Sequence, residues 1–401
     1  MSQPRPVLEV GDILRQHGDA FRAAQGQRLS THQKRVLSAL ECCRTAALGG
    51  HVEACDACGV VRISYNSCRN RHCPRCRGGA RALWLQQEAQ SLLPTEYFHV
   101  VFTLPAEVAA LALANRAVVY GLLFQAASAT VREVAADPKY LGAEVGMLAV
   151  LHTWGQNLHH HPHVHCVVSG GGLSCDEQGV VDPSPHWQSC RPGFFLPVRV
   201  LSRVYRGKLV QGLRQAYEGG ALSLGGSLAV LQDPAGFACW IKSLYQKEWV
   251  VYAKPPFGGP EQVLKYLAAY THGVAITNHR LVSLEEGEVS FVWKDYAHGS
   301  KQRVMRLSAE EFLRRFCLHI LPRGFVRIRH YGLLANRSRQ GKLALCRHLL
   351  GVRLLQSVVV AWSAQERRCP VCGVGVLRVI EMVPVGGCSE GGAPREVWDS
   401  S

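Results

Sequence analysis

Two cysteine pairs near the amino terminus constrain the chain more than any other feature. Cys55 and Cys58 form one Cys-x2-Cys knuckle, and Cys73 and Cys76 form another after fourteen intervening residues. Each knuckle offers two thiolates about one coordination edge apart, and tetrahedral zinc needs four ligands. The residues around the knuckles are polar, which argues against plain core thiols. The spacing therefore predicts a structural zinc on these four cysteines, which would fold a segment too polar to build its own core.

Other residues with metal-binding side chains surround the knuckles. They are the candidates for completing a second zinc site: Cys43, His51, Cys68 and His72. A third knuckle, Cys369 and Cys372, lies near the carboxyl terminus, with Cys388 as the obvious further cysteine there. That knuckle is half a zinc ribbon, and the sequence alone assigns it no metal.

Charge points to a polyanionic partner. The 401 residues hold 45 Lys and Arg against 30 Asp and Glu, a net charge of +15. Three stretches, residues 59–87, 183–217 and 312–365, contain no acidic residue at all. Solvated faces usually mix signs, whereas basic tracts interleaved with aromatic residues suit phosphates and stacked bases. The predicted DNA contacts are Arg69, Arg71, Arg75, Arg327, Arg329 and Tyr331.

The sequence predicts a cytoplasmic protein without a membrane partner. The longest apolar candidate, Val108 to Val131, is interrupted by Asn115 and Arg116 and falls short of a membrane span. The amino terminus lacks the basic-then-apolar pattern of a signal peptide. In a reducing compartment, the sixteen cysteines are expected to be metal ligands, catalytic thiols or core residues rather than disulfides.

A histidine-rich segment, Leu151 to Gly172, predicts a second kind of metal site. His163 and His165 flank Val164 on a predicted strand, so both imidazoles point to one face. Gln156 can add an oxygen ligand, with the histidines at 159–161 as competitors. A mixed nitrogen and oxygen set with open positions suits Mg²⁺ or Mn²⁺ on a phosphate, and zinc stays an alternative.

Two tyrosines are the candidate nucleophiles. Tyr266 and Tyr270 lie four residues apart on a helix predicted over residues 261–270, hence on one face. Such a pair alone is more often a core stripe, but the basic chain and the histidine pair favour catalysis. No phosphate-binding loop occurs, because Leu343 follows Gly341 and Lys342, and no nucleophile-elbow serine occurs.

The hydrophobic pattern predicts an α+β fold. Helices are expected at 33–47, 80–93 and 106–136, strands at 95–105, 146–153 and 163–168, and a hairpin turning at Glu286–Gly287. The predicted organisation is an N-terminal helix and zinc-binding module at 1–93, a catalytic domain at 94–330, and a basic C-terminal region at 331–401.

Several ordered motifs carry a resemblance to a known family. They are NSCRNRHCPRC at the knuckles, FTLP in a strand, HPHVHCVV, the two tyrosines, YTHGVAITNHRL, and LPRGFVRIRHYGLLAN at 321–336. The chain resembles the HUH rolling-circle nucleases, and specifically the two-tyrosine rolling-circle transposases of insertion-sequence family ninety-one, from about residue 33 to 375. One departure is Gly273, where an arginine is expected after YTH.

The resemblance implies a fold and a mechanism. The fold would be an HUH nuclease palm: an antiparallel sheet with flanking helices, both histidines on a central strand, and the tyrosine helix across it. The activity would be nicking and joining of single-stranded DNA at transposon ends and target through a 5′-phosphotyrosine. A divalent ion would be held by His163, His165 and Gln156, and a host helicase would unwind the DNA. The alternatives are a non-catalytic zinc-finger DNA-binding protein and an HUH replication initiator.

Overall fold

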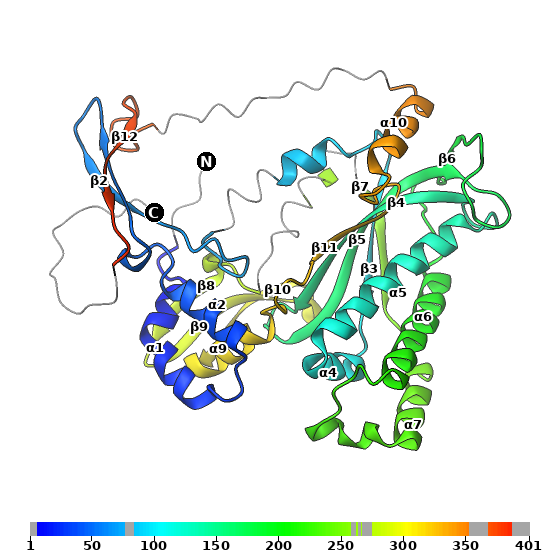
Figure 1. Cartoon of the computed structure of the whole chain (residues 1–401), viewed down its shortest axis with the longest axis horizontal. Coiled ribbons are helices and arrows are strands. Elements are labelled where there is room, and N and C mark those ends of the chain that lie inside the picture. The colour runs from blue at the N-terminus through cyan, green and yellow to red at the C-terminus, as the bar shows by residue number, and fades with distance from the viewer. Residues whose placement is uncertain are drawn as a thin grey trace. The chain divides into compact units, whose positions relative to one another are not determined.

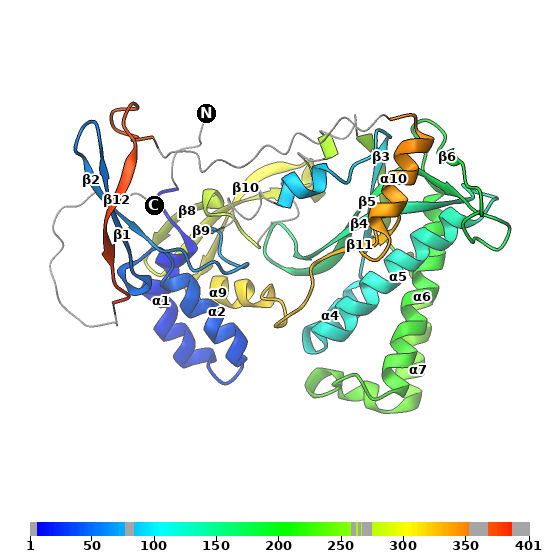
Figure 2. The ribbon, with the colours of Figure 1, turned by 45° about the horizontal axis from the view of Figure 1, so that its top comes forward.

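A computed structural model describes residues 6–76, 84–257, 262–263, 266, 275–352 and 368–386. The chain forms two compact units, each built from separate stretches of sequence (Figures 1 and 2). The cysteine unit combines Met1–Gly79, Ile276–Ile320 and Leu355–Ser401, and the sheet unit combines Ala80–Ala275 and Leu321–Leu354. This grouping differs from three consecutive domains at 1–93, 94–330 and 331–401. The predicted hairpin at 286–287 and the carboxyl-terminal knuckle both belong with the amino-terminal cysteines.

The sheet unit is built on an antiparallel sheet, which confirms the predicted α+β class. Its strand order is β11-β4-β5-β3-β7, with β6 paired to β5. The strands are β3 (Tyr97–Thr103), β4 (Ala143–Trp154), β5 (His160–Ser174), β6 (Trp187–Ser189), β7 (Val251–Phe257) and β11 (Ile328–Gly332). The strand with both predicted metal-binding histidines, β5, is therefore central.

One face of this sheet packs against helices. Along β3, Phe98, Val100 and Phe102 alternate onto that face and are fully buried. The ribbon of α5 runs diagonally across it in Figure 1, and residues of α4, α6 and α7 join the same core. The helices are α4 (Ala106–Ala114), α5 (Arg116–Ala136), α6 (Val198–Glu218) and α7 (Pro234–Tyr245), with α10 (Arg339–Leu349) elsewhere in the unit. As the interruption of the apolar run indicates, Asn115 separates α4 from α5.

The opposite face carries a smaller apolar cluster that positions the tyrosine helix. Tyr97, Val150 and Val167 are buried in it together with Val263. Gln262, Val263 and Tyr266 are helical, as predicted, and Tyr266 packs against this cluster. Since Val263 and Tyr266 are three residues apart, one helix face presents both to the sheet. Tyr270 lies outside the described residues.

The cysteine unit holds two three-stranded antiparallel sheets, β12-β1-β2 and β10-β9-β8. The hairpin turn between β8 and β9 has positive φ at Glu286 (50°) and Gly287 (77°), which confirms the prediction there. The elements are α1 (Val10–Gln25), α2 (Thr31–Glu41), β1 (Gly50–Cys55), β2 (Val61–Tyr65), β8 (Leu281–Glu285), β9 (Glu288–Asp295), β10 (Lys301–Ser308), α9 (Ala309–Leu318) and β12 (Leu377–Val383).

Helix α2 leads into the turn that carries Cys43. A capping box starts it: Ser30 Oγ accepts a hydrogen bond from Gln33 N, and Gln33 Oε1 accepts one from Ser30 N. Val36 and Leu40 are buried on its inner face. The helix ends at Glu41, and the following turn places Cys43 in the interior of the unit. Among the described residues, no helix is long and apolar enough to cross a membrane.

Candidate active site and metal centres

Three histidines converge on the sheet face that carries Tyr266. His163 and His165 share that face of β5, while Val164 between them is fully buried on the other. Strand β4 adds His152, whose Cα is paired with that of His163. One ring nitrogen from each of the three lies within 4.8 Å of the others. Imidazoles from two neighbouring strands thus form a candidate metal site.

The hydrogen bonds and burial of His163 suit it to metal binding. Its Nδ1 lies 2.7 Å from the carbonyl oxygen of His161, so Nδ1–H donates and Nε2 keeps its lone pair. Burial lowers the pKa of His163 to about 4. The ring is therefore neutral near neutral pH, which is the form that ligates metals.

Tyr266 lies directly beside these histidines. Its Oη is 2.6 Å from His99 Nε2 and 3.0 Å from His165 Nδ1. The rings of His99 and His165 stack with centroids 5.1 Å apart, and His99 Nε2 is 2.9 Å from His165 Nδ1. The tyrosine hydroxyl therefore shares a hydrogen-bonded cluster with one of the candidate ligands.

The sequence did not single out His99 or His152. His99 is a lone histidine within an apolar strand, and it is 3% exposed. His152 could have been found from strand register, because a hairpin centred on residues 157–158 places it opposite His163. Gln156, predicted as the third ligand, lies in the connection between β4 and β5, and its role stays a prediction. Of its competitors, His160 is 2.7 Å from the hydroxyl of Tyr120.

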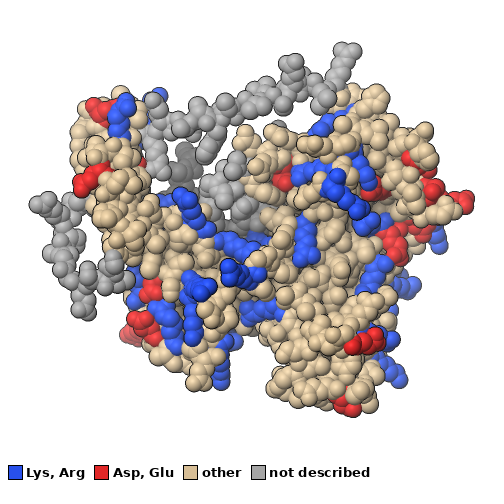
Figure 3. Space-filling view, viewed as in Figure 1, with Lys and Arg blue, Asp and Glu red and all other residues tan. Residues whose placement is uncertain are grey.

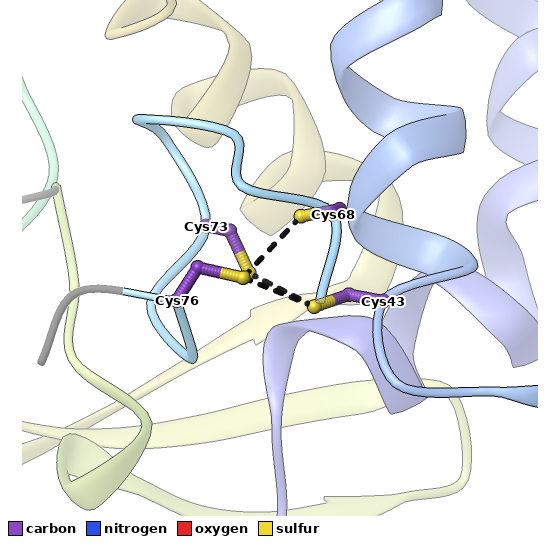
Figure 4. Close-up of side chains that lie close together, drawn as sticks. All are labelled: Cys43, Cys68, Cys73 and Cys76. Atoms are coloured by element: carbon purple, nitrogen blue, oxygen red, sulfur yellow. Dashed lines mark hydrogen bonds between the residues drawn. The ribbon is translucent and has the colours of Figure 1, made fainter. Parts of the chain in front are cut away.

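The cysteines form two clusters, and the predicted grouping of the ligands is wrong. Cys73 and Cys76 do not join Cys55 and Cys58. Figure 4 shows them with Cys43 and Cys68, contributed by the turn after α2 and the loop after β2. The other cluster is Cys55, Cys58, Cys369 and Cys372.

The reason for the regrouping is the β1–β2 hairpin. The first knuckle is its turn, and β2 then runs back along β1 for five residues. At about 3.3 Å per residue, that strand carries the second knuckle roughly 17 Å away from the first. The sulfur atoms of the second knuckle instead lie near Cys43 and Cys68. Cys76 Sγ is 3.3 Å from Cys43 Sγ and 3.6 Å from Cys68 Sγ. Among the described residues, His51 and His72 belong to neither cluster; His51 Nε2 is 3.1 Å from a Glu53 oxygen.

The predicted DNA contacts in the cysteine unit fall into two groups. Arg69 and Arg71 are exposed. Arg75 instead forms an ion pair with Glu9 at 3.1 Å, with both side chains less than one-fifth exposed. On the face seen in Figure 3, Lys and Arg cover more surface than Asp and Glu.

In the sheet unit, the predicted DNA contacts are half-buried. The Arg329 guanidinium lies 4.3 Å from the ring centroid of Phe124, and that of Arg327 lies 5.8 Å from the ring of Trp154. Tyr331 packs against the main core. A direct role of these residues in DNA binding stays a prediction.

Comparisons with known proteins show the family of the chain. A family model described as "Putative transposase" matches residues 146–342, and one described as "Transposase zinc-binding domain" matches residues 13–104. A protein of Sinorhizobium fredii named "Putative transposase y4qJ" is 53% identical over 98% of each chain. The transposase for insertion sequence element IS801 of Pseudomonas savastanoi pv. phaseolicola is 30% identical over 74% of this chain and 68% of its own. No solved structure matches.

The class that fold, site and matches define is the DNA transposases. Within that class, the chain belongs to insertion-sequence family ninety-one, the two-tyrosine group that its ordered motifs resemble. The structural role of zinc follows from the zinc-binding domain and the cysteine clusters.

Proposed function

We propose that this transposase nicks and rejoins single-stranded DNA through a covalent bond between Tyr266 and a 5′-phosphate. The observation that carries the proposal is the position of Tyr266 Oη, within hydrogen-bond distance of His99 and of the candidate ligand His165. A core tyrosine would need a single partner for its hydroxyl. A hydroxyl placed beside converging imidazoles is instead positioned to meet a phosphate bound there.

The chemistry is a transesterification. Tyr266 Oη gives up its proton and forms a bond to phosphorus, the bond from phosphorus to the 3′-oxygen breaks, and that oxygen takes up a proton and leaves as a 3′-hydroxyl. The hydrogen bonds between Tyr266 Oη and the rings of His99 and His165 fix the direction of the phenolic oxygen. Because the phosphodiester energy stays in the tyrosine–phosphate bond, a second 3′-hydroxyl can reverse the step on another strand without ATP.

The histidine cluster fits a divalent ion. Its rings come from strands rather than loops, at least one is neutral with Nε2 available, and three nitrogens leave coordination positions open. A bound Mg²⁺ or Mn²⁺ would supply Lewis-acid polarisation of the scissile phosphate. Nitrogen ligands favour Mn²⁺ over the harder Mg²⁺, so Mn²⁺ should support cleavage at lower concentration.

The proposal also covers the DNA and protein partners of the transposase and its location in the cell. The acid-free tracts supply phosphate contacts for single strands at the transposon ends and at the target. Since the sequence contains no phosphate-binding loop of a motor, a host helicase would separate the strands. The reaction would take place in the bacterial cytoplasm, at the nucleoid.

The test is to trap the covalent adduct. Single strands from the element's own ends, labelled at the 3′ end, are incubated with full-length protein and Mn²⁺, and adducts are resolved under denaturing conditions. Tyr266→Phe costs a hydroxyl and about 1 kcal/mol of stability, so the protein stays folded. We expect each of Tyr266→Phe and Tyr270→Phe to abolish transposition and the double variant to form no adduct. Tyr245→Phe, at an exposed tyrosine, is the control.

An adduct that persists in the correctly folded double variant contradicts the proposal. Tyr252 and Tyr296, both exposed, are then the next residues to test. Mass spectrometry of the adduct peptide identifies the attached residue directly.

A further inference from the structure

The cysteine cluster of Cys55, Cys58, Cys369 and Cys372 joins the two ends of the chain. The matched zinc-binding domain ends at residue 104 and does not reach its second pair. Strands β1 and β12 pair from Gly50 with Val383 to Cys55 with Leu377, which aligns the two knuckles at one end of the sheet. Both pairs lie in the same compact unit.

The two knuckles have the same backbone conformation. Gly59 N donates to the carbonyl oxygen of Cys55 at 3.0 Å, and Gly373 N donates to that of Cys369 at 2.9 Å. Both glycines have positive φ, 69° and 70°, a region that side chains disfavour. The two turns therefore have the same shape and lie at the same end of the sheet, although Gly59 and Gly373 are 314 residues apart in the sequence.

The sulfur positions suit a tetrahedral ion. Cys55 Sγ lies 3.7 Å from Cys372 Sγ, and Cys58 Sγ lies 3.8 Å from Cys369 Sγ. A tetrahedron with zinc–sulfur bonds of about 2.3 Å has sulfur–sulfur edges of about 3.8 Å. A disulfide would need about 2.05 Å, so these separations are those of shared coordination.

Backbone donors and packing complete the cluster. Cys58 N lies 3.5 Å from Cys55 Sγ, and Gly375 N lies 3.4 Å from Cys372 Sγ, the outer hydrogen bonds that stabilise metal-bound thiolates. A Cβ on Gly375 would overlap Cys55 Sγ. Asp56 also joins the two knuckle segments: its carboxylate accepts a hydrogen bond from Val376 N at 2.8 Å and forms an ion pair with Arg378 at 3.3 Å.

We propose that these four cysteines bind a second structural zinc, which ties the carboxyl-terminal knuckle to the amino-terminal hairpin. The ion completes the zinc-binding region only after Cys372 has been synthesised. This site is independent of the histidine cluster and of the proposed nuclease activity.

The test is the zinc content of the full-length protein, measured by elemental analysis after gel filtration. We expect one ion for each of the two cysteine clusters. The double variant Cys369→Ser/Cys372→Ser should lose about half of the zinc, and Cys55→Ser/Cys58→Ser should lose the same half. The control Cys239→Ser, at an exposed cysteine outside both clusters, should lose none.

Cobalt substitution keeps the proposal falsifiable if a double variant fails to fold. In full-length protein loaded with Co²⁺, Cys372→His replaces one sulfur by nitrogen and should shift about half of the visible d–d absorption to shorter wavelength. A wild-type protein with zinc for a single cluster, or unchanged zinc in both double variants, overturns the proposal. An unshifted cobalt spectrum in folded Cys372→His overturns it as well.

Discussion

At the scale of single residues, the function of the histidine cluster depends on which ring nitrogen of each histidine makes a hydrogen bond and which can bind a metal. His163 uses Nδ1 for a backbone carbonyl, and His165 directs Nδ1 toward His99 and Tyr266. His163 therefore has Nε2 available for a metal. Each ring is held by its outer hydrogen bond, which is how proteins fix the tautomer of a ligand.

His99 is expected to be a positioning residue. His99→Phe keeps an aromatic ring stacked on His165 but removes the nitrogen that contacts Tyr266 Oη. Loss of an outer hydrogen bond to a ligand typically costs about 10- to 100-fold in activity or metal affinity. We expect adduct formation to slow by that factor and the half-saturating Mn²⁺ concentration to rise. A slower rate with an unchanged Mn²⁺ dependence would contradict the idea that His99 acts by positioning His165. The control is His186→Phe, at an exposed histidine.

His152 and Gln156 are competing third ligands, and one comparison separates them. His152 is 5% exposed, and one of its ring nitrogens lies close to those of His163 and His165. If it ligates, His152→Ala should raise the Mn²⁺ requirement for adduct formation at least about tenfold, because a vacated position must be filled by water. Gln156→Ala should then have a small effect. A large effect of Gln156→Ala with a small effect of His152→Ala would instead support Gln156 as the third ligand, as the sequence predicts.

At the scale of elements, strand alternation is what separates chemistry from core. Odd-numbered residues of β3 and β5 place His99, His163 and His165 on one face, and even-numbered residues such as Phe98 and Val164 fill the helix-covered core. A slip of one residue in register would turn the histidines of the slipped strand toward the helix-covered core and its core residues toward the opposite face. The site is therefore only as stable as the pairing of these strands.

Gly332 provides a test of strand pairing at the β11 edge of the same sheet, where β11 pairs with β4. Its φ is +60°, and a Cβ there would overlap the carbonyl oxygen of Val145 on β4. Gly332→Ala should lower the free energy of unfolding by about 2 kcal/mol or more, because neither backbone can move cheaply. The control is Gly341→Ala, in helix α10 with open space around it, which should stabilise by about 0.5–1 kcal/mol. Urea denaturation measures both, and equal midpoints would contradict the strain argument.

At the scale of the whole molecule, the sequence predicts local features far better than distant pairings. The hairpin at Glu286–Gly287 and the shared face of His163 and His165 follow from neighbouring residues, and they are confirmed. Which knuckle joins which does not follow from spacing, because Cys58 and Cys369 are 311 residues apart. His152 needs strand register, and the regrouped units need the tertiary packing of segments from both ends of the chain.

DNA affinity is also a property of the whole basic chain, and we expect it to be strongly dependent on salt and greater for single strands than for blunt duplex. Each phosphate contact releases counterions and adds about 0.7 to the slope of log affinity against log salt on a single strand. Arg69 is exposed in an acid-free tract, whereas Arg314 is already paired with Glu311. Arg69→Gln should weaken binding to strands of different sequence equally and lower the slope by about 0.7, while Arg314→Gln leaves the affinity and the slope unchanged. Fluorescence anisotropy over a salt series measures the slope, and tighter binding to duplex than to the same strand unpaired would contradict the single-strand preference.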